Sequence, residues 1–454
     1  MVGLSSFLLI SYWFTRIESN LGAILALLMN RVGDVFFILG MVLSFLFFGS
    51  VDLLTFLPLP DLNYDLLLLP LFIAAMAKSA QLSLHIWLPY SMEGPTPISA
   101  SLHAATMVTA GVFLLLRLSL LLSYSYWALI LIIIIGGLTT FIGGTLALIS
   151  LDMKELIAYS TMSQLGYMVT ILGLKYANLS FFHLIFHAYF KALLFLTAGS
   201  IIHTFLDLQD LRLSGGLIKF LPLSFLMALI GFTSLTGLPF TTGFYSKEAI
   251  INSSYYSTHY LSQWIYFITL LTAFLTIAYS YRFLLTLFFK TTRLSLFSFL
   301  NLHYYSLHLT LSLTLIGICT IFIGFFYSKY LYLYNLPVNF YHLNLPFIIK
   351  ILPLLFFIIL FSVYFFWKNR FLLNISVMQN GYYYKIFYQA ITGYFISIAY
   401  RIFYKYFDYG FFDLLSPFTG SEFYSWSQRW SHYLNPSYYI PLILFFLYFL
   451  LYFF

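Results

Sequence analysis

Long runs of apolar residues, separated by short polar segments, dominate the sequence. They lie at 1–14, 22–49, 65–88, 97–121, 126–149, 155–174, 179–203, 217–252, 260–289, 308–335, 345–367 and 436–454. A helix needs about 17 to 25 residues to cross the hydrocarbon core, so every run except the first is long enough to span a membrane. Strands of a membrane β-barrel are about ten residues long and alternate in polarity, unlike these runs. The sequence therefore predicts an all-α polytopic membrane protein.

The composition excludes most other protein classes. Of the 454 residues, 8% are charged and 62% are hydrophobic, whereas an average soluble domain is about 25% charged. A soluble domain keeps a mostly polar exterior, so soluble enzymes, nucleic-acid-binding proteins and disordered proteins are ruled out. The single cysteine, Cys319, cannot supply an iron–sulfur cluster, and neither a Walker motif nor a haem-ligand pair is present. We expect no redox cofactor and no metal in this chain.

Lysine and arginine are distributed unequally between alternate connections. One set holds Arg16, Lys154, Arg212, Lys219, Arg282, Lys290, Arg293, Lys368 and Arg370. The other set holds only Arg117, Lys175 and Lys329, with Lys350 close by. Because cytoplasmic or matrix loops carry the excess of basic residues, we assign the first set to the inner side of the membrane.

Interruptions in the apolar runs suggest a domain plan. Residues 1–121 and 122–290 are predicted to form two related repeats of an inverted-repeat helix bundle, the second with a broken helix near 237–243 (Gly-Leu-Pro and a second Gly). Residues 291–371 add transmembrane helices, and 434–454 form a last one. Residues 372–433 carry spaced charges among many Tyr and Phe, which favours an amphipathic lateral helix along the inner interface. A solvated loop is the alternative for 372–433.

Several ionisable residues fall in the middle of apolar runs, where charges are costly and usually functional. Asp34 lies in NRVGD, Lys78 in AAMAKSAQ, His103 in SLHAATM and Lys247 in GFYSKEA. Lys247 follows the predicted helix break, where freed backbone carbonyls and water can stabilise a cation. His103 could connect the two halves, or it could be a packing histidine.

His183, His187 and Lys191 are spaced four residues apart in HLIFHAYFK. Residues with this spacing share one helix face, drifting about 40° and rising about 6 Å per step. Histidine titrates near neutrality, and lysine can do so when it is desolvated. The three residues therefore predict a proton relay through the hydrocarbon. Hydrogen bonds in helix packing are the alternative, and a zinc site is less favoured because no Cys or carboxylate accompanies the histidines.

Together these segments resemble the antiporter-like chain 5 family of NADH:ubiquinone oxidoreductase, the respiratory complex I. The resemblance is carried by the blocks 2–16, 30–34, 77–115 (AKSAQLSLHIWLPYSMEGPTPISASLHAATMVTAGVFLL), 152–168, 183–203, 207–250 and 407–420. The related chains 2 and 4 and the cation/proton antiporter subunits share the lysines and the broken helix. They match the GPTP and GFYSK blocks less well.

The resemblance implies a proton-translocating membrane-arm subunit with no redox centre of its own, in the mitochondrial inner membrane. FMN and iron–sulfur clusters are then expected in partner subunits, and another antiporter-like subunit is expected along the lateral helix. Lys78 is implied as the switching lysine and Lys247 as the carrier linked to the exit side. Asp152 and Lys154 resemble inner-side motif residues. The implied proton relay comprises Asp34, Lys78, His103, His183, His187, Lys191 and Lys247.

Two departures from the family matter. Ser83 stands where members often have Pro or Gly, so we expect a milder break after Lys78. In the family a glutamate precedes the VGLSS block and pairs with the switching lysine, whereas here Met1 comes first. We expect Lys78 to lack this partner, and a second polypeptide from a split gene to supply the glutamate and four preceding helices. A degenerate subunit that no longer pumps and an incomplete gene model are the alternatives.

Two other functions remain as competing hypotheses. The chain could be a subunit of a stand-alone cation/proton antiporter, which would keep the lysines but have no need of a docked lateral helix. It could also be a structural remnant that braces a complex without conducting protons. The intact set of mid-membrane ionisable residues argues against a remnant, because unused charges in a membrane cost stability.

Overall fold

The computed structural model describes residues 2–52, 64–205, 209–257, 260–290 and 307–333, together with Gly393, Tyr394, Ser397, Tyr400 and Arg401. The chain forms two units, Met1–Tyr382 and Tyr383–Phe454. The predicted spans 345–367 and 436–454 lie outside the described residues, as does nearly all of the segment 372–433. The helices of residues 2–333 all belong to the first unit.

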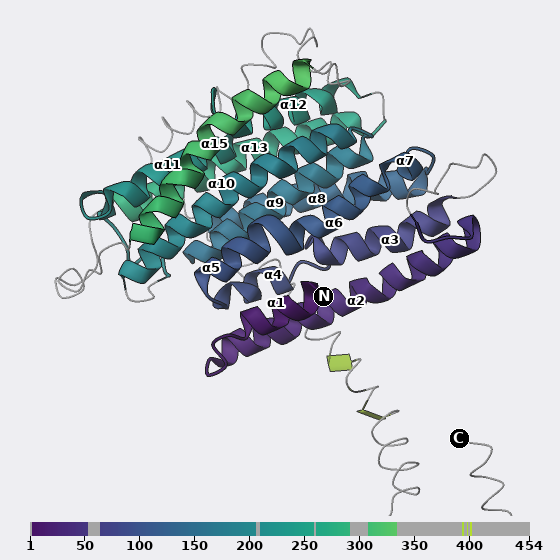
Figure 1. Cartoon of the computed structure of the whole chain (residues 1–454), viewed down its shortest axis with the longest axis horizontal. Helices are drawn as coiled ribbons and strands as arrows, with labels where there is room; N and C mark the ends of the chain where they lie inside the picture. The colour runs from purple at the N-terminus through teal and green to yellow at the C-terminus, as the bar shows by residue number, and fades with distance from the viewer. Residues whose placement is uncertain are drawn as a thin grey trace, which may run out of the picture. The chain divides into compact units, whose positions relative to one another are not determined.

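The regular elements of the described residues are all helical, which confirms the predicted all-α fold (Figure 1). In the described part of the chain, six helices are long and apolar enough to cross a membrane: Ile17–Phe48, Thr96–Arg117, Trp127–Ile149, Ala177–Thr204, Ser262–Phe289 and Leu307–Tyr327. The chain is thus a multi-pass membrane protein. The elements are α1 Val2–Ile10, α2 Ile17–Phe48, α3 Tyr64–Lys78, α4 Trp87–Tyr90, η2 Ser91–Glu93, α5 Thr96–Ser99, η3 Ala100–Thr106, α6 Met107–Arg117, α7 Ser119–Leu122, α8 Trp127–Ile149, α9 Met153–Gly173, α10 Ala177–Thr204, η4 Leu217–Lys219, α11 Pro222–Thr236, α12 Thr242–Tyr256, α13 Ser262–Leu284, η5 Leu285–Phe289 and α15 Leu307–Leu333.

Helix α9 forms the centre of this unit, and nearly all of its residues are buried. It contacts α8, α10 and α13, which surround it. Glycines allow α8 to approach it closely: a Cβ atom on Gly143 would lie 2.8 Å from the backbone nitrogen of Ser163. Because α9 has no lipid-facing side, it can carry polar residues such as Ser160 and Gln164 on its buried surface.

Two helices are interrupted where the mid-membrane lysines lie. Helix α3 ends at Lys78, and Ala80 (φ 48°) and Ser83 (φ 80°) then take left-handed conformations. The expectation of a milder break is therefore wrong, because Ser83 adopts the backbone conformation that favours glycine. The second interruption separates α11 from α12 and begins at Gly237, whose φ is 80°.

The predicted run 97–121 is also not one regular helix. It contains α5, a π-helical segment η3 and α6. His103 lies within η3. π-helical turns inside α-helices are frequent at functional sites, which makes His103 a candidate member of the site on structural grounds as well.

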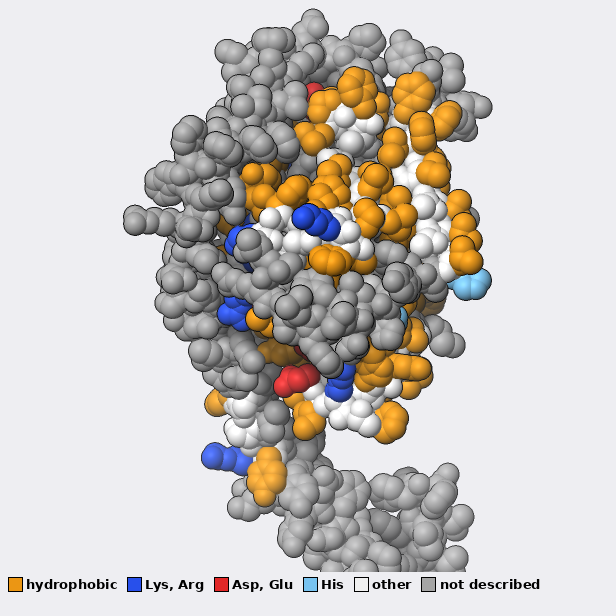
Figure 2. Space-filling model, turned by 90° about the vertical axis from the view of Figure 1, so that its left-hand side faces the viewer, with side chains coloured by type: hydrophobic (Ala, Val, Ile, Leu, Met, Phe, Trp, Pro, Cys, Tyr) orange, Lys and Arg blue, Asp and Glu red, His pale blue; other side chains and the backbone are white. Residues whose placement is uncertain are grey.

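Apolar side chains cover much of the described surface (Figure 2). Helix α2 illustrates this, because Ile24, Leu28, Val35 and Ile38 are all about half exposed or more. Exposed apolar residues in such number fit a surface that faces lipid tails or other hydrophobic helices.

Candidate functional site

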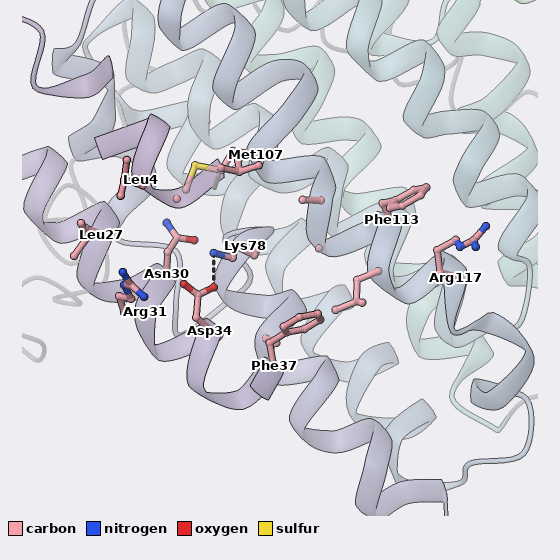
Figure 3. A pocket seen from close by; sticks show the side chains of 17 residues that line it. Leu4, Leu27, Asn30, Arg31, Asp34, Phe37, Lys78, Met107, Phe113 and Arg117 are labelled. Atoms are coloured by element: carbon pink, nitrogen blue, oxygen red, sulfur yellow. Dashed lines mark ion pairs between the residues drawn. The ribbon is translucent and has the colours of Figure 1, made fainter. Parts of the chain in front are cut away.

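An ion pair joins Lys78, at the end of α3, to Asp34 on α2. The Nζ atom lies 2.8 Å from Oδ1, and the two side chains are 24% and 39% exposed. Lys78 thus has a carboxylate partner within this chain, although not the glutamate that the family resemblance pairs with it. The pair opens into a cavity of about 750 Å³ between α1, α2, α3 and α6 (Figure 3). Gly3 of α1 also lies here, since a Cβ on it would be 3.8 Å from Lys78 Nζ.

Trp87 connects the end of α3 to His103. Its indole N–H donates to the carbonyl of Ala77 at 3.1 Å, and its ring centroid lies 5.8 Å from that of His103. His103 is 1% exposed, and neither ring nitrogen has a hydrogen-bond partner among the described residues. Buried polar groups are normally satisfied, and water is the partner that can reach between helices. Within the described residues no hydrogen bond joins Lys78 to His103 directly.

The three residues of the predicted ladder lie on α10, all buried. His183 Nδ1 lies 2.8 Å from Ser246 Oγ, and its Nε2 lies 3.2 Å from Gln164 Oε1. Lys191 donates to Ser160 Oγ at 2.6 Å, and the rings of His183 and His187 are 6.5 Å apart. The hydrogen-bond partners of His183 and Lys191 in these contacts are uncharged side chains.

Lys247 lies beside the broken helix. Its ammonium donates to Thr276 Oγ1 at 2.7 Å and to the last carbonyls of α11, Leu235 at 3.3 Å and Thr236 at 3.4 Å. These carbonyls have lost their helical partners because α11 ends there, and such helix ends coordinate cations in transporters. Since Ser246 precedes Lys247 on α12, the His183–Ser246 hydrogen bond links the ladder on α10 to this second lysine.

Lys154 differs from its sequence-based assignment among the inner loop charges. It is 1% exposed and donates to the carbonyls of Met92, at 3.3 Å, and Gly94, at 3.1 Å. Sequence position alone could not reveal this, because the residue lies in the first turn of α9, next to a genuine connection. Lys154 thus holds the segment before α5 against α9.

Asp152 and Asp210 form an isolated antiparallel bridge between the connection that precedes α9 and the segment that follows α10. Arg212 Nη2 lies 2.6 Å from Asp210 Oδ2, and this hydrogen-bonded ion pair lowers the pKa of Asp210. Burial raises the pKa of Asp152, and the neighbouring charge of Asp210 raises it further while Arg212 opposes the effect. The bridge ties the start of α9 to the segment after α10.

The sequence analysis missed the uncharged partners of the charged groups. Ser160, Gln164 and Tyr167 of α9 recur every three or four residues, so they share the face that meets α10 and α12. This spacing could have predicted a polar face on α9. The described residues contain no cluster of three or more His, Cys, Asp or Glu side chains that could hold a metal ion.

Comparisons with known proteins agree with this architecture. Residues 1–276 match a family described as "NADH:quinone oxidoreductase/Mrp antiporter, TM". The NADH-ubiquinone oxidoreductase chain 5 of Metridium senile is 46% identical over 359 residues, covering 78% of this chain and 59% of the relative. That of Acanthamoeba castellanii is 39% identical over 460 residues, covering 92% of this chain and 68% of the relative. The chain thus spans only about half to two thirds of the length of the chain 5 relatives that it matches.

A solved structure shares the fold. A chain in the Mrp complex of Dietzia sp. DQ12-45-1b superposes with a TM-score of 0.70 at 25% identity, covering 86% of this chain and 45% of that one. The relatives found by sequence are chain 5 proteins, whereas the relative found by structure belongs to an antiporter complex. The family description names both kinds of protein. This chain therefore belongs to the NADH:quinone oxidoreductase/Mrp antiporter transmembrane family, alongside the NADH-ubiquinone oxidoreductase chain 5 proteins.

Proposed function

We propose that the chain translocates protons in the membrane arm of a proton-translocating NADH:ubiquinone oxidoreductase. The observation that carries this is the buried hydrogen bond between His183 on α10 and Ser246 on α12, since it brings the helix that carries Lys191 against the residue next to Lys247. Charges inside a membrane are kept for such roles. The redox energy would come from other subunits, which carry the FMN and iron–sulfur clusters.

In this proposal Lys78 and Lys247 are the two switching lysines. Lys78 alternates between pairing with Asp34 and releasing its proton toward His103, with water completing the path. The α10 ladder then passes the charge to Lys247. Moving one charge through 100 mV costs about 2.3 kcal/mol, so pairing energies of a few kcal/mol are sufficient to gate each step.

The proposal includes partners of the chain. A helix from a second polypeptide, carrying a carboxylate, covers the cavity at Lys78; the exposed Val2 and Leu4 on α1 support this, because they line the cavity wall. An antiporter-like subunit lies beside residues 372–433. The complex resides in the mitochondrial inner membrane, as the chain 5 relatives suggest.

Lysine substitutions in the intact complex test the function. The assay is proton uptake per electron in reconstituted vesicles oxidising NADH. Lys78→Met and Lys247→Met should each lower the proton-to-electron ratio. Lys175→Met is the matched control, because Lys175 is exposed and donates only to the Ser123 carbonyl, at 2.9 Å.

The results separate the competing functions. Unchanged ratios in both lysine variants would leave the chain as a structural brace. Purification of the chain in a complex without flavin, iron–sulfur clusters or NADH oxidation would instead identify a stand-alone cation/proton antiporter.

A further inference from the structure

A row of buried hydroxyl groups extends from Lys247 along α13. Thr269, Thr272 and Thr276 are each 0% exposed, and their spacing of three and four residues places them on one face of the helix. A valine would fill the same space as a buried threonine in an apolar helix. Packing alone therefore does not explain three buried hydroxyls on one face.

Contacts tie this row to Lys247 at one end and to α9 in its middle. The Lys247 ammonium donates to Thr276 Oγ1 at 2.7 Å and lies 5.8 Å from the ring centroid of Tyr167. The Tyr167 hydroxyl is hydrogen-bonded to Thr272 Oγ1 and donates to the carbonyl of Thr269 at 2.8 Å. Tyr167 is itself 0% exposed, so these contacts are shielded from the surroundings.

The charge distribution gives the row a direction. Arg282 lies near the C-terminal end of α13, on the basic inner side, and Lys290 follows it. Thr269 lies in the opposite half of the helix, toward the connection 257–261, which contains no Lys or Arg. The row therefore leads from Lys247 in mid-membrane toward the outer side.

We propose that Thr276, Thr272 and Tyr167 form the first part of the route by which a proton leaves Lys247 toward the outer side. This inference rests on the proposed function and deepens it by naming the release path. Thr276 accepts the proton of the ammonium on its oxygen as it gives up its own, which leaves Lys247 as a neutral amine. Each later hydroxyl likewise gains one proton and loses one, so no bond other than O–H and N–H changes.

The geometry is suited to this transfer but leaves one gap within the row. The row ends at Tyr167, because the other partner of its hydroxyl is the backbone carbonyl of Thr269, and water must carry the proton from there to the outer side. Thr276 now donates to the carbonyl of Ala273 at 2.7 Å, and a hydroxyl can rotate to another acceptor. Thr272 and Thr276 are one turn apart, about 6 Å along the axis, so a single water must bridge them. Beyond that gap, Thr272 and Tyr167 are in direct contact.

Conservative substitutions test the route in the intact, reconstituted complex, with protons per electron as the readout. Thr276→Val and Tyr167→Phe keep the shape of the side chain but remove the hydroxyl. Both should reproduce the fall in the ratio caused by Lys247→Met, and Thr276→Ser should restore the wild-type ratio. The matched control is Thr197→Val, since Thr197 is equally buried and donates only to Leu194 of its own helix.

The outcomes distinguish this inference from the proposed function. If Lys247→Met lowers the ratio while Thr276→Val and Tyr167→Phe do not, the route is refuted and the function stands. If Thr197→Val lowers the ratio as much as Thr276→Val, or Thr276→Ser fails to restore it, the effect is one of packing and the route is likewise overturned. If Lys247→Met itself leaves the ratio unchanged, the role of Lys247 in the proposed function is refuted, and the route from it is refuted as well.

Discussion

Removing the charge of Asp34 should weaken the hold on the Lys78 ammonium. At the observed 2.8 Å, Coulomb's law gives about 1.5 kcal/mol at the dielectric of water and about 6 kcal/mol at an effective dielectric of 20. The two side chains are 24% and 39% exposed, so solvent screening favours the lower part of this range. We take about 1.5 to 3 kcal/mol, which corresponds to roughly a 10- to 150-fold change in the paired-to-unpaired equilibrium.

This magnitude is comparable to the work of moving a charge through 100 mV, about 2.3 kcal/mol. Asp34→Asn should therefore stop proton translocation at a lower opposing membrane potential than the wild type tolerates. The assay is the proton-to-electron ratio in vesicles clamped at a series of potentials. Asp34→Glu should largely preserve the wild-type curve, and Glu18→Gln, which removes an exposed carboxylate from the same helix, is the control. A curve for Asp34→Asn that overlays the wild type would refute the role assigned to the ion pair.

Two further predictions concern the contact between α11 and α12 and the connection before α9. Gly243→Ala should reduce the amount of assembled complex, measured on native gels, because its Cβ would overlap the carbonyl of Ser234 where α12 meets α11. Asp152→Asn should raise the hydrogen-exchange protection of the Met153 amide, which donates to Gln209, at neutral pH. Burial raises the pKa of Asp152, so the penalty for its charge in the folded state develops as pH rises above the ordinary pKa and is complete above the raised pKa. Below the ordinary pKa the two proteins should converge, and equal protection at neutral pH would contradict this.

Sequence patterns predicted two local features of the candidate site, the shared helix of the α10 residues and the helix break beside Lys247. The spacing of His183, His187 and Lys191 required them to share a face of any helix they formed, and α10 places them so. The Gly and Pro residues before Lys247 predicted freed carbonyls, and the ammonium does bind two of them. In both cases local geometry alone determines the result.

Features that depend on contacts between distant segments were beyond sequence reasoning. Asp34 and Lys78 lie on different helices, and only the packing of α2 against α3 brings them together. The left-handed conformation of Ser83 is imposed by the surrounding structure on a residue with no intrinsic preference for it. The threonines of α13 carry no charge and resemble ordinary helix residues, so the sequence gives no sign of the contacts of Thr276 with Lys247 and of Thr272 with Tyr167.

The central claim is that one polar path joins Lys78 to Lys247, and it can be seen directly. The decisive measurement is a structure of the intact complex at a resolution that shows ordered water. We predict water hydrogen-bonded to the ring nitrogens of His103, in a line that continues toward Lys78 on one side and Lys191 on the other. A dry, apolar gap between Lys78 and His103, with lipid or aliphatic side chains packed against both, would contradict the account.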